Sequence, residues 1–468
     1  MSERKMIYLC LAHMSEDGME QKYVKEAFDT NWVVPMGPNV NEFEKSLTEF
    51  VNEVRCQKED VRCEPLDRKV VCLSAGTAAV HLALIACGVK AGDEVLVQSF
   101  TFCASSHPIT YLGAKPIFVG SEGETWNMDP ELLEAAIIDR KAKTGVYPKA
   151  IVPVALYGMP YRIDEIMAIA DKYGIPVIED AAEGMGSRFN GQVLGTFGKY
   201  GVLSFNGNKM ITTSGGGALI CRSAEEANEI MWYATQARDA YPYYQHTAIG
   251  FNYRMSNVCA GIGRGQMTVI DDHIAHHKHV QALYEELLAD VPGITLHCQP
   301  ECRVESVECR GSSEVESIPV YDSNYWLCAA TIDPEVRVKG QENAYKEVIK
   351  TAVGGAAGVI HAVDRATTDC QPNENVEALR VFMLERKIEC RPLWKPMHKQ
   401  PVYRGKVEEL KNEIINDDVM CLTSNASVAY TRGIEEELFK VGFCLPAGPY
   451  VTDDDVRYIV ECIKEAIE

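Results

Sequence analysis

Short apolar runs alternate with amphipathic stretches over residues 69–221, and few folds accommodate such an alternation. The apolar runs are bounded by Gly, Pro and Asp and predict strands over 70–73, 94–98, 116–119, 150–154, 176–179, 201–205 and 217–221. The amphipathic stretches predict helices over 77–87, 130–141 and 163–173. Strands that alternate with helices predict an α/β fold in which helices cover both faces of a mostly parallel sheet.

The pattern changes in the second half of the chain. Residues 255–289 predict one long helix that leaves the first domain. Beyond it we expect a strand over 325–332 and helices over 376–386, 428–441 and 453–467, which is an α+β arrangement. A chain of 468 residues is expected to form more than one domain. We therefore expect a large domain over 1–265 and a small C-terminal domain over 266–468, with polar insertions near 298–317 and 339–373.

Charge and hydropathy limit the partners. The chain has 46 basic and 67 acidic residues, a net charge of −21. An acidic surface argues against a nucleic-acid partner, which needs a basic stripe, but a local pocket can still bind a small anion. No apolar run is long enough to span a membrane, and the short run 6–12 is a poor export signal because Glu16 and Asp17 follow it. We expect a cytoplasmic protein that contacts no membrane.

Cysteines and histidines raise the question of a metal. The 17 cysteines include no C-x-x-C pair, so most are expected to be small buried residues. Cys298, Cys302 and Cys309 lie in a polar insertion, and their spacing matches no standard zinc pattern, which leaves a metal or disulfide role open. The predicted long helix carries His273, His276, His277 and His279. The first three share a face, but a solvated face explains them more simply than a metal site, so no metal is expected.

The first candidate binding feature is a turn of small residues at 73–80. A strand ends there and a helix starts at once, with Ala75, Gly76 and Thr77 at the junction. Exposed backbone N–H groups and the helix dipole make such a turn suitable for a phosphate. An ordinary strand-to-helix turn is the alternative.

The second feature is Asp180, which closes an apolar strand. Ligands of open α/β sheets bind at the carboxyl ends of the strands. A carboxylate there can pair with a protonated pyridine nitrogen, and this pairing makes the ring an electron sink. A helix N-cap is the alternative reading of Asp180.

The third feature is Lys209, in a Gly/Asn-rich turn that precedes a triple glycine at 215–217. A partly desolvated lysine can form a Schiff base, and Ser204 at the end of the preceding strand could bind the same phosphate. A surface-loop lysine is the alternative. The order is more informative than the parts, because a phosphate turn, a strand-end Asp180 and a loop Lys209 follow one another as in pyridoxal-phosphate enzymes of fold type I. Phe102, at another strand end, could stack on a cofactor ring or pack in the core.

With these motifs, the chain resembles the DegT-type pyridoxal-phosphate nucleotide-sugar aminotransferases, especially the 4-aminotransferases of UDP-bacillosamine and GDP-perosamine type. The resemblance runs from Met6 to the C-terminus and is carried by residues 15–38, 74–79, 99–102, 179–183, 204–217, 250–257 and 391–403. The most specific stretch is Ser204-Phe205-Asn206-Gly207-Asn208-Lys209-Met210-Ile211-Thr212-Thr213. The resemblance implies an aspartate-aminotransferase-like fold of fold type I, with pyridoxal 5′-phosphate bound by the large domain.

The resemblance also implies which residues act. Lys209 and Asp180 would be catalytic, with Lys209 bonded to the cofactor and Asp180 facing the ring nitrogen. The implied cofactor-binding set is Ala75, Gly76, Thr77, Phe102, Asp180, Glu183, Ser204, Asn206, Lys209 and Asn252. Within it, the 75–77 turn and Ser204 would hold the phosphate, Phe102 would stack on the ring, and Glu183 would lie near the ring hydroxyl. Asn252 would reach the phosphate of a neighbouring subunit's cofactor, which implies a homodimer with shared active sites.

Four further residues are expected to border the substrate pocket by the same resemblance: Trp32, Arg254, Arg391 and His398. Arginine suits phosphate recognition, although surface loop residues remain an alternative for Arg391 and His398.

The implied activity is the transfer of an amino group, by family habit from L-glutamate, to a 4-keto-6-deoxy sugar on a nucleotide. We expect UDP and an N-acetylated sugar, in the synthesis of cell-surface polysaccharide or glycan precursors. Relatives that remove a sugar hydroxyl have His in place of the lysine, so Lys209 favours amino transfer. The alternatives are a lyase or aldolase of the same fold and a non-catalytic regulatory family member. The presence of Lys209, Asp180 and Ser204 argues against the regulatory member.

Overall fold

The computed structural model describes residues 4–55, 65–301, 319–345, 370–404, 411–416, 419–423 and 427–467. Most of the predicted insertions near 298–317 and 339–373 lies outside these ranges, and so do Cys302 and Cys309. Most of the cysteines within the ranges are buried or half-buried, as predicted.

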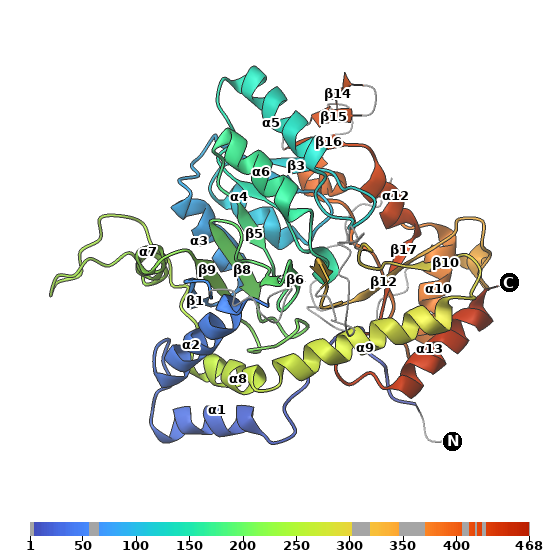
Figure 1. The fold of residues 1–468 in the computed structure, drawn as a ribbon, viewed down its shortest axis with the longest axis horizontal. Helices are drawn as coiled ribbons and strands as arrows, with labels where there is room; N and C mark the ends of the chain where they lie inside the picture. The colour runs from blue at the N-terminus through green and yellow to red at the C-terminus, as the bar shows by residue number, and fades with distance from the viewer. Residues whose placement is uncertain are drawn as a thin grey trace, which may run out of the picture.

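One large sheet dominates the first part of the chain (Figure 1). Its first four strands, in spatial order, are β1 (Lys69–Leu73), β9 (Gly217–Cys221), β8 (Tyr200–Ser204) and β5 (Ile178–Asp180). The order continues through β4 (Ile151–Val152), β2 (Glu94–Gln98), β3 (Lys115–Val119), β16 (Val428–Thr431), β15 (Val419–Thr423) and β14 (Lys411–Asn416). Parallel bridges from Ile151 to Val177 and from Val154 to Asp180 join the two groups. From β8 through β5, β4, β2 and β3 to β16 the neighbours are parallel, which confirms the predicted mostly parallel sheet.

Helices cover the sheet because its strands bury side chains on both faces. In β2, Leu96 belongs to one apolar cluster, whereas Val95 and Val97 belong to another. The helices of this part are α1 (Met19–Asp29), α2 (Pro38–Asn52), α3 (Gly76–Ala86), α4 (His107–Tyr111), α5 (Pro130–Thr144), α6 (Ile163–Tyr173) and α7 (Ala224–Ala234). Shorter elements are η1 (Cys103–Ser105), η2 (Leu156–Gly158), β6 (Arg188–Phe189) and β7 (Gln192–Val193).

Two helices, α8 (Asn257–Met267) and α9 (Ile270–Leu288), lead into the C-terminal part. The single helix predicted over 255–289 is broken because Val269, with φ −124°, leaves the helical region. In Figure 1, α9 runs from the large sheet to α13 (Asp453–Ala466). The second core lies around β10 (Ile294–Leu296), β12 (Cys328–Ile332), β17 (Gly442–Leu445), β13 (Arg391–Pro392) and α10 (Glu374–Glu385). Shorter elements are β11 (Tyr321–Asp322), η3 (Gln341–Asn343), η5 (Met397–Lys399) and α11 (Pro401–Arg404).

The helix predicted over 428–441 is wrong in its first part. Residues 428–431 form β16, Gly433 turns the chain with φ +83°, and α12 (Ile434–Val441) follows. Val428 pairs with Ile117 and Tyr430 with Val119, so pairing with β3 overrides the local pattern. A C-terminal strand thus extends the sheet of the first part, and the division into domains over 1–265 and 266–468 stays a prediction.

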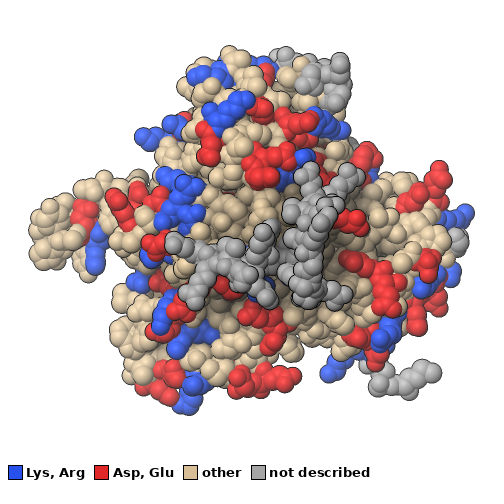
Figure 2. All heavy atoms as spheres, in the orientation of Figure 1, with Lys and Arg blue, Asp and Glu red and all other residues tan. Residues whose placement is uncertain are grey.

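On the face drawn in Figure 2, acidic and basic side chains are interspersed. Within the described ranges, no helix has both the length and the apolar character that a bilayer span requires.

Candidate active site

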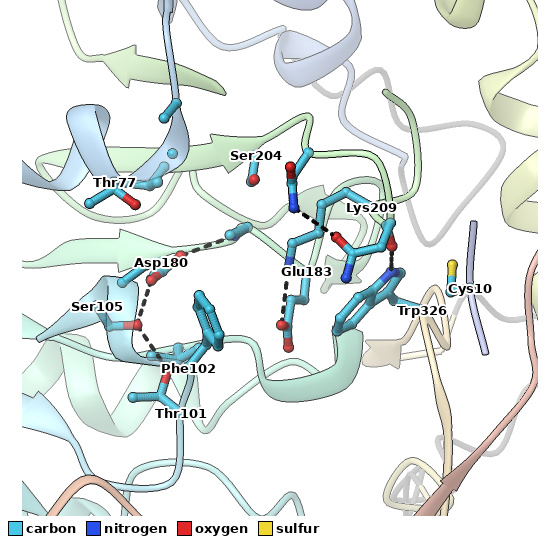
Figure 3. Close-up of a pocket in the computed structure, with 18 of the residues that line it drawn as sticks. Cys10, Thr77, Thr101, Phe102, Ser105, Asp180, Glu183, Ser204, Lys209 and Trp326 are labelled. Carbon is cyan, nitrogen blue, oxygen red and sulfur yellow. Dashed lines mark hydrogen bonds and ion pairs between the residues drawn. The ribbon is translucent and has the colours of Figure 1, made fainter. Parts of the chain in front are cut away.

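A pocket of about 600 Å³ opens at the carboxyl ends of β5 and β8 (Figure 3). Small-molecule sites commonly have volumes in this range. From the predicted set, the pocket wall contains Ala75, Gly76, Thr77, Phe102, Asp180, Glu183, Ser204, Asn206, Lys209 and Arg391. Segments that are far apart in the sequence therefore meet here, as their positions at strand ends predict.

The first turn of α3 rests on the strands that end in Ser204 and begin at Gly217. A Cβ on Gly217 would lie 2.3 Å from the backbone nitrogen of Gly76, so glycine is needed for this approach. A Cβ on Gly76 would lie 3.1 Å from the Cβ of Ser204. The N–H groups of a first helical turn have no partner within the helix. Together with the Ser204 hydroxyl they form a cradle suited to a phosphate.

Asp180 is buried at one side of the pocket, with 5% of its surface exposed. Its Oδ2 accepts a hydrogen bond from Ser105 Oγ over 2.6 Å, and its Oδ1 accepts one from the Ala182 N–H over 3.2 Å. Ser105 is itself 2.8 Å from Thr101 Oγ1. The next element after β5 is a strand, so Asp180 caps no helix.

The electrostatics of Asp180 favour a cationic neighbour. Burial raises the pKa of its carboxyl group, and the hydrogen bonds from Ser105 and Ala182 together with the charge of Lys209 oppose that rise. A protonated ring nitrogen beside this carboxylate would further stabilise its charged form.

Lys209 lies on the other side of the pocket in Figure 3, and its side chain is only 11% exposed. Its Nζ donates to Glu183 Oε1 over 3.0 Å and lies 4.1 Å from the centre of the Trp326 ring. Burial raises the pKa of Glu183 to about 6, against the opposing effects of Lys209 and of the Tyr157 N–H. Because Lys209 is largely buried and pairs with Glu183 inside the pocket, the surface-loop alternative for Lys209 is wrong.

Aromatic rings form a further wall of the pocket. Phe102 is 53% exposed and faces the pocket, with its ring centre 5.5 Å from that of Trp394, so it is not a core residue. Trp394 also contacts Tyr157 and Trp326, with ring centres 5.3 Å and 6.4 Å away. A flat ligand ring can pack between such side chains.

Arg391 is a second cation of the wall. Its Nε and Nη2 donate to Glu389 Oε1 over 2.8 Å and 2.6 Å. Glu389 Oε2 also accepts from the Leu9 N–H over 3.0 Å, so the N-terminal segment closes this side of the pocket. About 41% of the Arg391 side chain remains exposed to bind an anion.

Two of the predicted residues, Trp32 and His398, lie outside the pocket wall. Trp32 is 42% exposed, and its carbonyl accepts a hydrogen bond from Asn257. His398 is buried and bridges Ser99 Oγ over 2.6 Å and Glu436 Oε1 over 2.9 Å. Within one chain, His398 ties the C-terminal part to the end of β2 rather than facing a ligand.

Asn252 and Arg254 also lie outside the wall, in the segment between α7 and α8. Asn252 is exposed, and its backbone bridges to Thr235. The backbone of Arg254 bridges to Leu73, and its Nε is buried with no partner in the described part of the chain.

The four histidines of α9 each make a separate hydrogen bond and do not gather into one cluster. The acceptors are Met210 O for His273, Val451 O for His276, Tyr325 O for His277 and Asp453 Oδ1 for His279. Cys298 contacts Glu285 over 3.4 Å. Among the residues that the structure describes, no group of three or more His, Cys, Asp or Glu could hold a metal ion.

Ser105, Trp326 and Glu389 are among the residues of the pocket wall that lie outside the predicted set. Ser105 follows the recognised stretch 99–102 closely, and a polar residue just after a strand-end motif was a usable signal. Trp326 and Glu389 have no local signal, because they come from the C-terminal part and meet the pocket only through the tertiary fold.

The residues of the pocket fit pyridoxal 5′-phosphate. The α3 turn with Ser204 suits a phosphate, Asp180 suits a ring nitrogen, and Phe102 offers a ring face. Lys209 provides a primary amine on the opposite side of the same pocket from Asp180.

Comparison with known proteins agrees with this arrangement. A sequence model of the DegT/DnrJ/EryC1/StrS aminotransferase family matches residues 14–312. The chain is 36% identical over 459 residues to EpsN of Bacillus subtilis strain 168, named as a candidate pyridoxal phosphate-dependent aminotransferase. That match covers 98% of this chain and 95% of EpsN. The chain is 29% identical over 460 residues to GDP-perosamine synthase of Escherichia coli O157:H7, covering 98% of this chain and 99% of that relative.

Solved structures show the same fold. A DegT DnrJ EryC1 StrS aminotransferase from Brucella abortus matches with a TM-score of 0.72 at 22% identity, over 96% of this chain and 95% of that one. Spr1654 from Streptococcus pneumoniae, named as a candidate sugar aminotransferase and solved in its PLP form, matches with a TM-score of 0.71 at 19% identity, over 98% of each chain.

Proposed function

The chain belongs to the DegT/DnrJ/EryC1/StrS aminotransferase family, and from this premise we propose that it moves an amino group from L-glutamate to the keto carbon of a nucleotide-linked 4-keto-6-deoxy sugar. The family is that of pyridoxal-phosphate-dependent nucleotide-sugar aminotransferases, with the α/β fold of fold-type I enzymes. The amino donor, the sugar and the nucleotide are the proposed part.

One observation carries the proposal: a single pocket joins the α3 cradle, Asp180 and Lys209. Amino transfer needs an anchored cofactor, a group that keeps its ring protonated and a base beside the reacting carbon. The α3 cradle would anchor the cofactor, Asp180 would keep its ring protonated, and Lys209 would be the base. A binding protein would not need a buried carboxylate and a buried lysine in the same pocket.

When bound, pyridoxal phosphate supplies an aldehyde that exchanges amino groups and a ring that withdraws electrons from the neighbouring carbon. We assign the phosphate to the first turn of α3 and Ser204, with Asn206 nearby, and the ring nitrogen to Asp180. Lys209 would hold the cofactor through its amine, and as a free amine it would move a proton at the donor's α-carbon. Glu183 accepts a hydrogen bond from Lys209 and orients it within the pocket.

The acceptor is proposed from the relatives and from the pocket wall. One relative is named for GDP-perosamine, whose synthesis places an amino group on a sugar carried by a nucleotide. Arg391 supplies a half-exposed guanidinium suited to an anionic part of the substrate. We favour a UDP-linked, N-acetylated 4-keto sugar, in the synthesis of cell-surface polysaccharide or glycan precursors.

We also propose a homodimer in which each subunit completes its partner's site. The segment after α7 projects from the body of the molecule in Figure 1 and exposes large apolar residues. These are Tyr241, Tyr243, Tyr244 and Ile249, each more than half exposed. Asn252 follows this segment, is exposed and lies outside its own pocket wall, so it is free to reach a second subunit. Trp32 and Arg254 are assigned to the same composite site.

The test is product analysis with purified protein, pyridoxal phosphate and L-glutamate. UDP- and GDP-linked 4-keto-6-deoxy sugars are supplied in parallel, and 2-oxoglutarate and amino sugar are quantified by mass spectrometry. We expect both products in equal amounts with one nucleotide preferred. Loss of the sugar without release of 2-oxoglutarate would instead identify a lyase or aldolase.

A further inference from the structure

Lys209 has two partners in the pocket, and only one of them is an acid. Glu183 accepts its hydrogen bond, while the face of Trp326 lies 4.1 Å from its Nζ. An indole face attracts an ammonium group because the ring quadrupole is negative there, and Trp is the best of the aromatic residues at this. Trp326 is 2% exposed, so little water competes for the contact.

Trp326 is also held against the loop that carries the lysine. Its Nε1–H donates to the carbonyl of Asn208 over 2.7 Å, one residue before Lys209. Figure 3 shows the indole beside Lys209 with this hydrogen bond drawn. One side chain therefore contacts both the amine and the backbone next to it.

The turn before Trp326 is built to hold that position. Tyr325 has φ +48°, a left-handed conformation that a bulky residue adopts only when its surroundings impose it. His277 of α9 donates to the Tyr325 carbonyl over 3.1 Å, and Asn324 Oδ1 accepts from the Trp326 N–H over 2.8 Å. These contacts fix the turn from two sides.

The same turn holds the segment that carries Glu183. Asn324 Nδ2 donates to the carbonyls of Glu183 and Met185 over 2.8 Å and 2.9 Å. A Cβ on Gly158 would lie 1.9 Å from Asn324 Oδ1, so this approach needs a glycine at 158, where φ is +94°. The turn thus positions both partners of the lysine amine.

We propose that Trp326 is a positioning residue for Lys209: its ring stabilises the ammonium form of the freed lysine and keeps Nζ in the pocket beside Glu183. The inference rests on the proposed role of Lys209 in amino transfer. A lysine that leaves the cofactor in each half-reaction must stay in reach and must gain and lose a proton. A charged acid alone would hold the proton tightly, whereas a neutral ring face adds attraction without accepting the proton.

The test labels Lys209 in the full-length protein after removal of the cofactor. Acetic anhydride acylates only neutral amines, so the rate of Lys209 labelling, followed by peptide mass spectrometry, reports its neutral fraction and its accessibility. We compare Trp326→Leu, which removes the ring, with Trp326→Phe, which keeps a weaker ring face. Trp394→Leu is the matched control, because it opens the same pocket while the contact between Trp326 and Lys209 remains.

At pH 7.5 Lys209 should be labelled about threefold to tenfold faster in Trp326→Leu than in wild type, as expected from the loss of a cation–π contact. The labelling rate in Trp326→Phe should lie between those in wild type and Trp326→Leu. The ratio of the labelling rates in Trp326→Leu and wild type should shrink only as the pH rises above about 10.4, the ordinary pKa of a lysine side chain, because the neutral amine predominates above that pH. A change in access alone, as in Trp394→Leu, gives a ratio that stays constant with pH. The ionisable groups near Nζ are Glu183, Asp180 and Cys10, and all are unchanged in these variants.

The inference would be overturned if Lys209 were labelled equally fast in Trp326→Leu and wild type, or if the ratio of these two labelling rates did not change with pH. If Trp326→Leu does not fold, Trp326→Phe alone decides, with a rate about twofold above wild type at pH 7.5 expected and an equal rate contradicting it. In amino transfer, kcat should fall about tenfold in Trp326→Leu and be largely restored in Trp326→Phe, with the KM for glutamate nearly unchanged. Absence of amino transfer in wild type would reject the proposed function but leave the labelling result readable.

Discussion

Lys209 and Asp180 lie on opposite sides of one pocket, and each is held by neighbours that fit its proposed role. Lys209 donates to Glu183, and Asp180 accepts from Ser105. Both side chains are largely buried, which removes the competition of water and strengthens their interactions with a bound cofactor.

Replacement of Lys209 by Ala should abolish turnover without unfolding the protein. Glu183 loses its partner, but its pKa of about 6 lets it take up a proton at low cost. We expect kcat to fall by about a thousandfold or more, because no other base replaces the lysine amine. The measurements are initial rates with glutamate and keto sugar, and thermal unfolding. Lys90→Ala, at an exposed lysine, is the control, and a Lys209→Ala rate close to that control would reject the assignment.

Replacement of Asp180 by Asn tests the ring-nitrogen contact. The amide oxygen can still accept from the Ala182 N–H, and the amide N–H can donate to the Ser105 hydroxyl, so the pocket should keep its shape and bind the cofactor. The negative charge is lost, and we expect kcat to fall about a hundredfold, roughly 3 kcal/mol in barrier. Ser105→Ala keeps the charge of Asp180 but loses the 2.6 Å hydrogen bond to it. The kcat of Ser105→Ala should lie between those of wild type and Asp180→Asn. A twofold effect of Asp180→Asn would rule out the role.

At the scale of elements, the contact between α3 and β9 shapes the phosphate cradle. Gly217→Ala places a Cβ 2.3 Å from the Gly76 nitrogen and must push the first turn of α3 away. We expect the cofactor to bind about tenfold to a hundredfold more weakly, since several N–H groups shift together. Gly207→Ala is the control, because a Cβ there meets nothing within 4 Å. Equal cofactor affinity in the two variants, measured by absorbance titration, would contradict this account of the cradle.

Helix α9 carries a histidine that should make the protein sensitive to acid. Burial lowers the pKa of His277 to about 3, so the folded protein resists protonation that the unfolded chain accepts below its ordinary pKa of 6.5. This contribution to stability is complete above pH 6.5 and is lost as the pH falls towards 3. Between pH 7 and pH 5 the loss should be about 2 kcal/mol.

His277→Asn can keep the donor to the Tyr325 carbonyl but cannot be protonated. We expect it to be less stable than wild type at pH 7, because it leaves a small cavity. The difference should shrink by about 2 kcal/mol at pH 5 in urea unfolding experiments. A constant difference at the two pH values would show that His277 is protonated in the folded state.

Sequence patterns predicted elements well where Gly, Pro or charge bounded an apolar run. The strands Glu94–Gln98 and Gly217–Cys221 and the helix Ile163–Tyr173 agree to the residue. Residues 428–431 were misassigned because their partner, β3, is distant in the sequence. For the same reason Trp326 could not be assigned to the lysine, since its contact with Asn208 spans 118 residues. Local chemistry at strand ends is visible in a sequence, whereas contacts between the two halves are not.

The molecule as a whole is negatively charged, whereas its pocket is suited to a ligand that is itself negatively charged. The chain carries a net charge of −21, yet the pocket is suited to a phosphate. The phosphate cradle consists of backbone N–H groups and a hydroxyl, which need no excess of basic residues. Lys209 and Arg391 are the only cationic side chains among the described residues of the wall. A pocket with so few cations can use donors from a second subunit to hold an anionic substrate.

Mixing two inactive variants tests whether subunits share sites. Asn252 is exposed and lies outside its own pocket wall, so in a dimer it could reach the site that contains the partner's Lys209. In a heterodimer of a Lys209→Ala chain and an Asn252→Ala chain, one site would then carry both changes and the other neither. After subunit exchange at equal amounts, about a quarter of wild-type activity should appear, because half of the dimers are mixed and each has one intact site. Asn252→Ala alone must first be shown to be impaired, and exchange must be confirmed with differently tagged chains. If tagged heterodimers form and no activity appears, Asn252 acts within its own chain and the shared-site proposal is wrong.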